Sequence, residues 1–398
     1  MSIWTLGAAA VAVFWSLEWA TRTALRKRRG SDGRTTQALR DRFTAWRNNP
    51  AFHRSDIRMN TQGFRRNRNV SLRKPAATRR LFLLGGSTAY GAQGGFTHID
   101  SRWSRIHNHE LIDAFLEKQL NAAVAPAGDE VINAAVSGYR MHQQLALIQS
   151  RLRRYQPDDV ILMDGYNDFI QLYNWARSGH QGDFDVYGNT PGYEDFDSLA
   201  NPGSMRSLLI FGAAWLRARS SLMNLASSRL SGSVRNPWRS VIPAVQPEFN
   251  ADVRWGDLNG DERIAATAAL EHVSYYAATT RQIHRILGLD GVRPIFLLQP
   301  ILILAKKPLT KEEQLFVQYE WQQGGPLYFY LFREVYRRFD QEMSEAARDE
   351  GFRYLNLVNV FDSTGEQTFS DFAHLTPAGN RIIAGKLFGE LCPPGLAV

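Results

Sequence analysis

The segment at residues 80–91, Arg-Leu-Phe-Leu-Leu-Gly-Gly-Ser-Thr-Ala-Tyr-Gly, constrains the fold more than any other part of the sequence. Its apolar run at 81–84 is short and unbroken, which is typical of a strand buried on both faces of a parallel sheet. The run ends at Gly85 and Gly86, which have no Cβ atom and therefore permit a tight turn. We predict that the hydroxyl of Ser87 lies just beyond the carboxyl end of this strand, where open α/β sheets bind their ligands. Because Gly-Gly-Ser is also common in ordinary turns, the role of Ser87 depends on the rest of the chain.

From residue 80 onward, short apolar runs alternate with stretches of helical periodicity. Strands are expected at 81–84, 130–133, 159–163, 294–298 and 352–357, and helices at 98–120, 141–154, 267–287, 328–348 and 377–391. This alternation predicts an α/β fold, with a parallel sheet covered by helices on both faces. The 398 residues, 44% of them hydrophobic, are enough for one large core or two smaller ones.

Residues 171–261 fit this rhythm poorly, because they are rich in Gly, Asp, Asn, Ser and Arg. We interpret them as a long insertion and a candidate cap over the site. A structureless loop of this length is unusual in a compact domain, so we expect the insertion to have structure of its own.

The first thirty residues combine an apolar run with a basic flank. Residues 3–17 are almost wholly apolar, Trp4, Trp15 and Trp19 lie near the two ends of the run, and basic residues begin at Arg22. About twenty apolar residues span a bilayer, and tryptophans gather at its interfaces. No small-residue cleavage pattern follows the run. We therefore predict a retained single-pass membrane anchor at 1–30, a basic connector at 31–79 and one domain at 80–398; the alternatives are an amphipathic surface helix or a poor signal sequence.

The net charge of +8 is concentrated in arginines of the first eighty residues. Such a block suits a membrane surface or another anionic partner. Nucleic acid is not an expected partner, since no nucleic-acid motif accompanies the arginines and aromatic residues are not interleaved with them. The positive flank follows the predicted anchor, and the positive-inside rule then favours a cytoplasmic domain.

No metal or other cofactor is expected. Cys392 is the single cysteine, which excludes an internal disulfide and a cysteine-based zinc site. Residues 257–262 resemble the start of a calcium loop, but the glycine comes one position early and Ala268 stands where a bidentate Glu is needed. His107 and His109 are two residues apart on a predicted helix, and side chains at that spacing do not face each other.

Four segments at predicted strand ends each supply a group that acyl transfer needs. Ser87 follows the first strand, Gly138 the second and Asn167 the third, while Asp371 and His374 precede the last helix. Parallel strands all end at one edge of a sheet, so we expect these segments to converge. A serine hydroxyl needs a base within hydrogen-bond reach, which His374 would provide. Asp371 would hold the Nδ1 proton of that imidazole and stabilise the cation. The N–H groups of Ser87 and Gly138 and the amide of Asn167 are candidate donors to the oxyanion.

These segments resemble the sequence blocks of the SGNH hydrolases, also called the GDSL esterase/lipase family. The stretch 165–168, Gly-Tyr-Asn-Asp, matches the family's Gly-x-Asn-Asp, and 371–374, Asp-Phe-Ala-His, matches its Asp-x-x-His. The resemblance covers roughly residues 80–391. It implies a flavodoxin-like three-layer sandwich with a central parallel sheet, a Ser87–His374–Asp371 triad, and an oxyanion hole made by Ser87, Gly138 and Asn167. The family's first block usually reads Gly-Asp-Ser, so Gly86 replaces a carboxylate that helps to order the loop.

The resemblance and the predicted anchor together imply an esterase that removes short acyl groups, such as acetyl, from a cell-envelope glycan or lipid. An O-acyltransferase with the same residues and a catalytically silent glycan-binding protein are the alternatives. An anchored family member that acts on the envelope belongs on the periplasmic or extracytoplasmic side, whereas the flanking charge favours the cytoplasm. We expect the outer side.

Overall fold

The computed structural model describes residues 37–94, 105–123, 128–179, 184 and 252–392. Five parallel strands form the central sheet, in the order β4-β3-β5-β6-β7. They are β3 (Arg80–Gly85), β4 (Glu130–Asn133), β5 (Asp159–Asp164), β6 (Arg293–Leu298) and β7 (Arg353–Asn356). Each strand end lies within one residue of its predicted position, and the strand order is that of flavodoxin-like folds. The predicted parallel sheet is thus confirmed.

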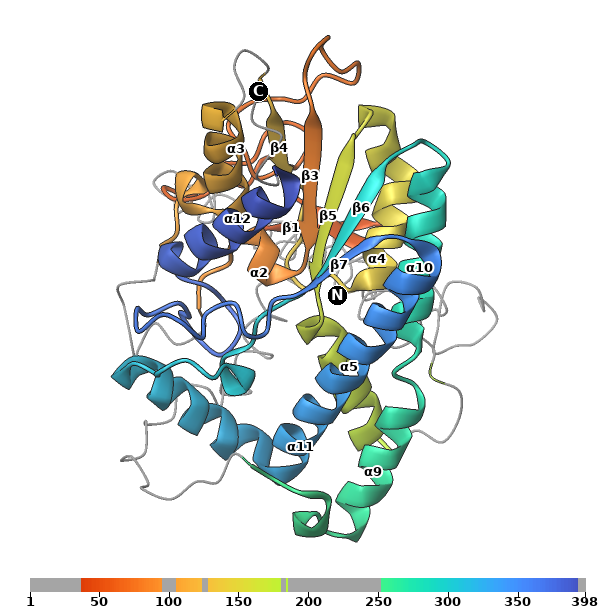
Figure 1. Ribbon diagram of the computed structural model, residues 1–398, viewed down its shortest axis with the longest axis vertical. Helices are drawn as coiled ribbons and strands as arrows, with labels where there is room; N and C mark the ends of the chain where they lie inside the picture. The colour runs from red at the N-terminus through yellow and green to blue at the C-terminus, as the bar shows by residue number, and fades with distance from the viewer. Residues whose placement is uncertain (1–36, 95–104, 124–127, 180–183, 185–251, 393–398) are drawn as a thin grey trace, which may run out of the picture. The chain divides into compact units, whose positions relative to one another are not determined.

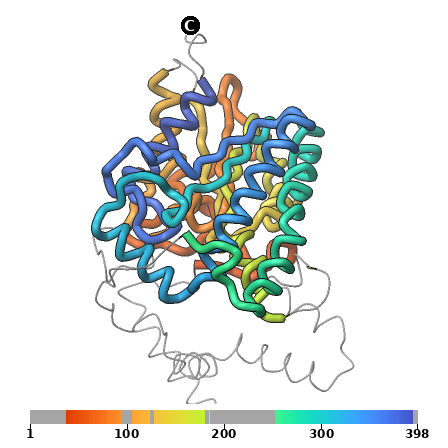
Figure 2. Tube along the Cα trace, turned by 60° about the horizontal axis from the view of Figure 1, so that its bottom comes forward, coloured from red at the N-terminus to blue at the C-terminus, as the bar shows by residue number. Residues whose placement is uncertain are grey.

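Helices cover both faces of the sheet (Figures 1 and 2). On one face, α3 (Ile112–Ala123) packs against α12 (Pro377–Leu391). On the other face, α10 (Tyr275–Gly288) packs against α4 (Met141–Leu147) and against α11 (Lys311–Glu350). The short α2 (Ser87–Tyr90) and α5 (Tyr166–Arg177) begin where β3 and β5 end. The carboxyl ends of two neighbouring strands therefore both lead directly into helix starts.

Three helix predictions need correction. The helix expected at 98–120 begins only at Ile112 within the described residues, after a 3₁₀ turn at Asn108–Glu110. The single helix expected at 267–287 is two helices, α9 (Gly260–Glu271) and α10. The helix expected at 328–348 is the second half of α11, whose two halves meet at Gly325 (φ +64°) before Pro326 and run in different directions (Figure 1). Proline cannot continue the hydrogen-bond ladder of a straight helix, which explains the kink.

Capping boxes explain two of the helix starts. The side chain of Asn259 accepts a hydrogen bond from the Glu262 amide at 3.0 Å, and Thr310 accepts one from the Glu313 amide at 3.2 Å. In each pair the glutamate side chain accepts from the amide of the capping residue. The acidic stretch at 257–262 is therefore mostly a helix start. Within the described ranges, no group of three or more His, Cys, Asp or Glu side chains is arranged to hold a metal ion.

The described part of the predicted insertion lies at its two ends. Residues 171–177 belong to α5, and Trp255–Asp257 forms a 3₁₀ turn before α9. The ring of Phe184 packs on Trp175, His272 and Tyr275. Most of the remaining insertion falls outside the described residues.

The segment predicted as a connector at 31–79 is, from residue 37 on, in close contact with the α/β domain. It begins with an antiparallel hairpin of β1 (Ala38–Asp41) and β2 (Ala45–Asn48). Further along, Ile57, Met59, Phe64 and Val70 are buried in the domain's hydrophobic core.

The predicted anchor at 1–30 lies outside the described residues. No helix among the residues that are described has the length and apolar character needed to cross a bilayer.

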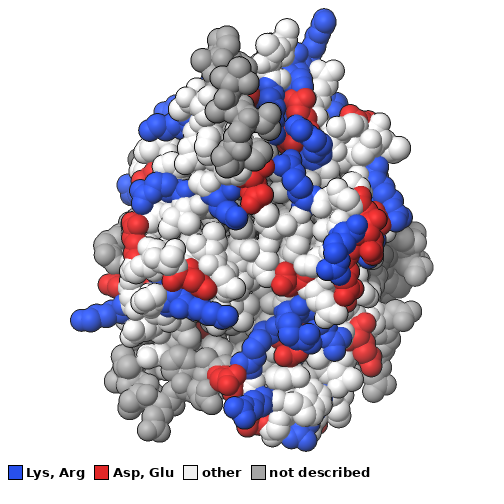
Figure 3. All heavy atoms as spheres, viewed as in Figure 1, with Lys and Arg blue, Asp and Glu red and all other residues white. Residues whose placement is uncertain are grey.

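On the face drawn in Figure 3, Lys and Arg side chains are interspersed with Asp and Glu. Proteins that follow a nucleic-acid backbone instead present a continuous basic track. That face therefore carries charges of both signs side by side.

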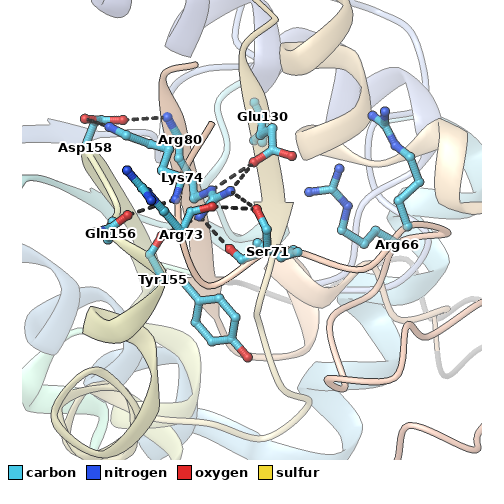
Figure 4. Close-up of polar contacts among 12 residues, drawn as sticks. Arg66, Ser71, Arg73, Lys74, Arg80, Glu130, Tyr155, Gln156 and Asp158 are labelled. Carbon is cyan, nitrogen blue, oxygen red and sulfur yellow. Dashed lines mark hydrogen bonds and ion pairs between the residues drawn. The ribbon is translucent and has the colours of Figure 1, made fainter. Parts of the chain in front are cut away.

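Arg80 fixes the amino-terminal edge of the sheet (Figure 4). Its guanidinium is fully buried and donates to Glu130 Oε2 at 2.8 Å, to the Ser71 carbonyl at 2.9 Å and to the Tyr155 carbonyl at 2.6 Å. Beside it, Lys74 forms an ion pair with Asp158. The chain at Ser71, the start of β4 and the chain at Tyr155 are thus all tied to the first residue of β3.

Replacing Arg80 with Ala should reduce the free energy of unfolding by about 3–5 kcal/mol. The reason is that Glu130 and the carbonyls of Ser71 and Tyr155 would lose a buried cationic partner. Denaturant unfolding measures this loss. The matched control is Arg68→Ala, since that side chain is 74% exposed and its pair with Glu117 should contribute about 1 kcal/mol or less. Equal stabilities of the two variants would contradict the structural role of Arg80.

Candidate active site

The turn that carries Ser87 has no room for side chains at the two residues before it. Gly85 has φ +147°, and a Cβ atom there would lie 2.4 Å from the Met163 carbonyl oxygen. A Cβ atom on Gly86 would lie 2.2 Å from Nδ2 of Asn167. Gly86 thus allows the amide of Asn167 to approach the serine turn closely. The family that these sequence blocks resemble usually has an aspartate at the position of Gly86. With the backbone as it is here, the side chain of that aspartate would displace the Asn167 amide.

Asp371 and His374 form a hydrogen-bonded pair in the loop before α12. Oδ2 of Asp371 lies 2.7 Å from Nδ1 of His374. Oδ1 of the same carboxylate accepts the backbone amides of Ala373 at 2.8 Å and His374 at 2.7 Å. Three hydrogen bonds therefore fix the carboxylate, which is 1% exposed, against the imidazole.

The electrostatics of this pair favour the charged imidazolium–carboxylate state. Burial acts to raise the pKa of Asp371, but the His374 cation and the hydrogen bonds to His374 and Ala373 outweigh it, so the pKa is lowered. Burial acts to lower the pKa of His374, but the Asp371 carboxylate outweighs it, so the pKa is raised above its ordinary value of 6.5. A base of this kind can hold a proton taken from a neighbouring hydroxyl.

The serine turn and the histidine loop are in direct contact. Oγ1 of Thr88, the residue after Ser87, donates to the carbonyl of Ala373, the residue before His374, at 3.2 Å. Nε2 of His374 is buried and has no hydrogen-bond partner in the described part of the chain, so its bond to Ser87 Oγ is not formed in this state. Catalytic hydrogen bonds of this type often tighten only when substrate is bound.

The loop that carries Gly138 lies next to Asn167. Gly138 has φ +83°, a left-handed conformation that favours glycine. Nδ2 of Asn167 donates to the carbonyl of Tyr139 at 2.9 Å. A carboxamide nitrogen carries two N–H donors, so this bond leaves the second one for a ligand. Asn167 thus touches both the serine turn and the glycine loop.

The buried carboxylate of Asp168 connects these loops to neighbouring helices. Its Oδ1 accepts the Met141 amide at 3.2 Å and the Tyr275 hydroxyl at 3.0 Å, which connects α5 to the starts of α4 and α10. Burial raises the pKa of Asp168 to about 6. Its full burial and its bonds to the scaffold indicate a supporting role.

Two residues lie near the site although no pattern in the sequence predicts this. Glu320, in the first half of α11, is buried, and burial together with the nearby Asp371 charge raises its pKa to about 8. Trp46, from the hairpin, lies against Gly138, since a Cβ atom on that glycine would be 3.2 Å from Cζ2 of the indole. Neither belongs to a recognisable motif, and both are far from the site in sequence.

The comparisons with known proteins give a family and several distant structures. The sequence model of the GDSL-like lipase/acylhydrolase family matches residues 83–382. No curated protein matches the chain. Among solved structures, an acetylxylan esterase from Geobacillus stearothermophilus is 12% identical, with a TM-score of 0.40, over 79% of this chain and 94% of that one. The acetyl xylan esterase AlAXEase is 10% identical, with a TM-score of 0.39, over 79% of this chain and 100% of that one.

Proposed function

Because the chain belongs to the GDSL-like lipase/acylhydrolase family, it is a carboxylic ester hydrolase, and we propose that Ser87, His374 and Asp371 form its catalytic triad. The observation that carries this proposal is the Asp371–His374 hydrogen bond at 2.7 Å, together with the contact between Thr88 and Ala373. The pair fixes the tautomer in which Nε2 is free to accept a proton. The contact brings the serine turn to the same loop.

In the proposed reaction, Oγ of Ser87 attacks the ester carbonyl while Nε2 of His374 takes the hydroxyl proton. The N–H groups of Ser87 and Gly138 and the free N–H of Asn167 donate to the oxyanion of the tetrahedral intermediate. The intermediate breaks the ester C–O bond, and the imidazolium returns its proton to the leaving alkoxide. Water then attacks the acyl-enzyme, with His374 again as the base, and releases the carboxylic acid and Ser87.

We further propose that the acyl group is short, such as acetyl, and that it is removed from a cell-envelope glycan or lipid. The predicted anchor supports this location for the substrate. The test compares hydrolysis of p-nitrophenyl acetate and p-nitrophenyl palmitate by the full-length chain. The proposal predicts a kcat/KM at least about tenfold higher for the acetate, which corresponds to about 1.4 kcal/mol of transition-state binding. A preference for the palmitate would contradict a short-acyl site, and no hydrolysis of either would contradict the triad.

We propose that residues 1–30 anchor the chain in a membrane, with the catalytic domain on the extracytoplasmic side. The apolar run with tryptophans near its ends supports the anchor. A reporter enzyme that is active only outside the cytoplasm, fused at the C-terminus, should be active. Activity only of a cytoplasmic reporter at the same position would place the domain on the other side.

A further inference from the structure

The hairpin of β1 and β2, here called the N-terminal hairpin, packs on the loop that carries Gly138. Nε1 of Trp46 donates to the carbonyl of Ser137 at 3.0 Å. The indole also lies against Gly138 itself, close enough that a Cβ atom there would be 3.2 Å from Cζ2. One side chain thus fixes the peptide group that contains the Gly138 N–H, since the carbonyl of Ser137 and that N–H belong to the same peptide plane.

Other bonds from the N-terminal hairpin hold the same loop on both sides of Gly138. The hydroxyl of Tyr139 donates to the carbonyl of Trp46 at 2.5 Å, and the two rings meet edge to face at 5.9 Å. Nδ2 of Asn48 donates to the Ala135 carbonyl at 2.9 Å, and Nε2 of Gln143 donates to the Thr44 carbonyl at 2.8 Å. The loop and the first turn of α4 are therefore tied to the hairpin on both sides of Gly138.

The same loop orients a second candidate donor. Nδ2 of Asn167 donates to the carbonyl of Tyr139 at 2.9 Å, so the direction of its remaining N–H depends on where Tyr139 is held. Tyr139 in turn is bonded to Trp46 through its hydroxyl. Two of the three candidate oxyanion donors, Gly138 and Asn167, are thus positioned through contacts with the hairpin.

We propose that Trp46 is a positioning residue for the oxyanion hole, a role that rests on the function proposed above. Oxyanion donors must lie within about 0.5 Å of their working positions, and removal of one donor costs about 10²–10³ in kcat. Trp46 does not touch the reacting atoms. It holds the Ser137–Gly138 peptide plane and, through Tyr139, the amide of Asn167.

The test measures steady-state kinetics of the full-length chain with p-nitrophenyl acetate. Trp46→Phe keeps a ring over Gly138 but removes the Nε1–H donor, so kcat should fall about tenfold. This is smaller than the loss of about 10²–10³ in kcat that follows when an oxyanion donor itself is removed. Trp46→Ala removes the ring as well, and its kcat should fall about 100-fold. KM should stay within about threefold of wild type, because these contacts act mainly in the transition state. Rates are normalised to active sites by endpoint titration with a fluorophosphonate, which separates positioning from loss of folded protein.

Two comparisons complete the test. Arg42→Ala changes an exposed residue of the same hairpin and should leave kcat unchanged. The acid limb of the pH profile should stay in place in both Trp46 variants, because Trp46 has no hydrogen bond to Asp371 or His374 among those described.

If Trp46→Ala does not fold, Trp46→Phe and Tyr139→Phe still decide the question. The proposal is overturned if the folded variants have a kcat per active site within twofold of wild type. This includes the case in which total activity falls only because fewer active sites are present. An inactive wild type would instead contradict the proposed function.

Discussion

Replacing Ser87 with Ala should lower kcat for p-nitrophenyl acetate by at least about 10⁴-fold, because the proposed reaction forms the acyl-enzyme on the oxygen of Ser87. The substitution removes one oxygen from a half-buried position at the start of α2, where the backbone is set by Gly85 and Gly86. The fold should therefore be unaffected, and thermal unfolding checks this directly. The residual rate would come from the oxyanion donors and substrate binding alone.

The matched control for this substitution is Ser344→Ala. Ser344 lies on α11 beside β7, an edge strand that is separated from β3 by β5 and β6. Its replacement should leave kcat unchanged. A Ser87→Ala enzyme that keeps wild-type activity would remove Ser87 from the chemistry, and equal losses in both variants would indicate a general effect on folding.

Replacing Asp371 with Asn should lower kcat by about 10⁴-fold, the loss seen for the equivalent change in the serine-protease template. The structure supplies the reason. Oδ1 of Asp371 accepts two backbone amides, so an asparagine would place its oxygen there and its NH₂ group toward Nδ1 of His374. Nδ1 would then have to accept, and the proton would move to Nε2. The imidazole would point a donor at the serine and could not act as its base.

The pH dependence of the Asp371→Asn enzyme provides a second readout. The Asp371 carboxylate raises the pKa of His374 against the effect of burial, so the wild-type enzyme should gain activity as the pH rises through a value above 6.5. Without the carboxylate, burial alone acts on the imidazole, and the acid limb should move to lower pH. The control is Asp349→Asn, whose side chain is 69% exposed and which should leave the profile unchanged. An unmoved acid limb in Asp371→Asn would mean that the profile reports another group.

The strands could be predicted from the sequence because burial on both faces leaves an unbroken apolar run. In β3, the residues from Leu81 to Leu84 are all buried, and the run stops where Gly85 and Gly86 form the turn. The Asp371–His374 pair was also predictable, since both residues belong to one short motif and their contact spans three positions.

The helix boundaries were less predictable for a physical reason. The apolar pattern marks which residues face the core, but helix starts are set by caps such as Asn259 with Glu262. The N-terminal hairpin was missed because its strands have only four residues each and carry charged residues in place of an apolar run. Its important bond joins Trp46 to Ser137, and no local pattern reports a contact over 91 positions.

Covalent labelling with a fluorophosphonate tests the central claim most directly. An activated serine attacks the phosphorus and releases fluoride, with the hydroxyl proton passing to the histidine, whereas an ordinary serine does not react at a comparable rate. The full-length chain should gain one phosphonyl group, and mass spectrometry of its peptides should place this group on Ser87, with no labelling of Ser87→Ala. Absence of an adduct, or an adduct on a different residue, would contradict a nucleophilic Ser87 activated by His374.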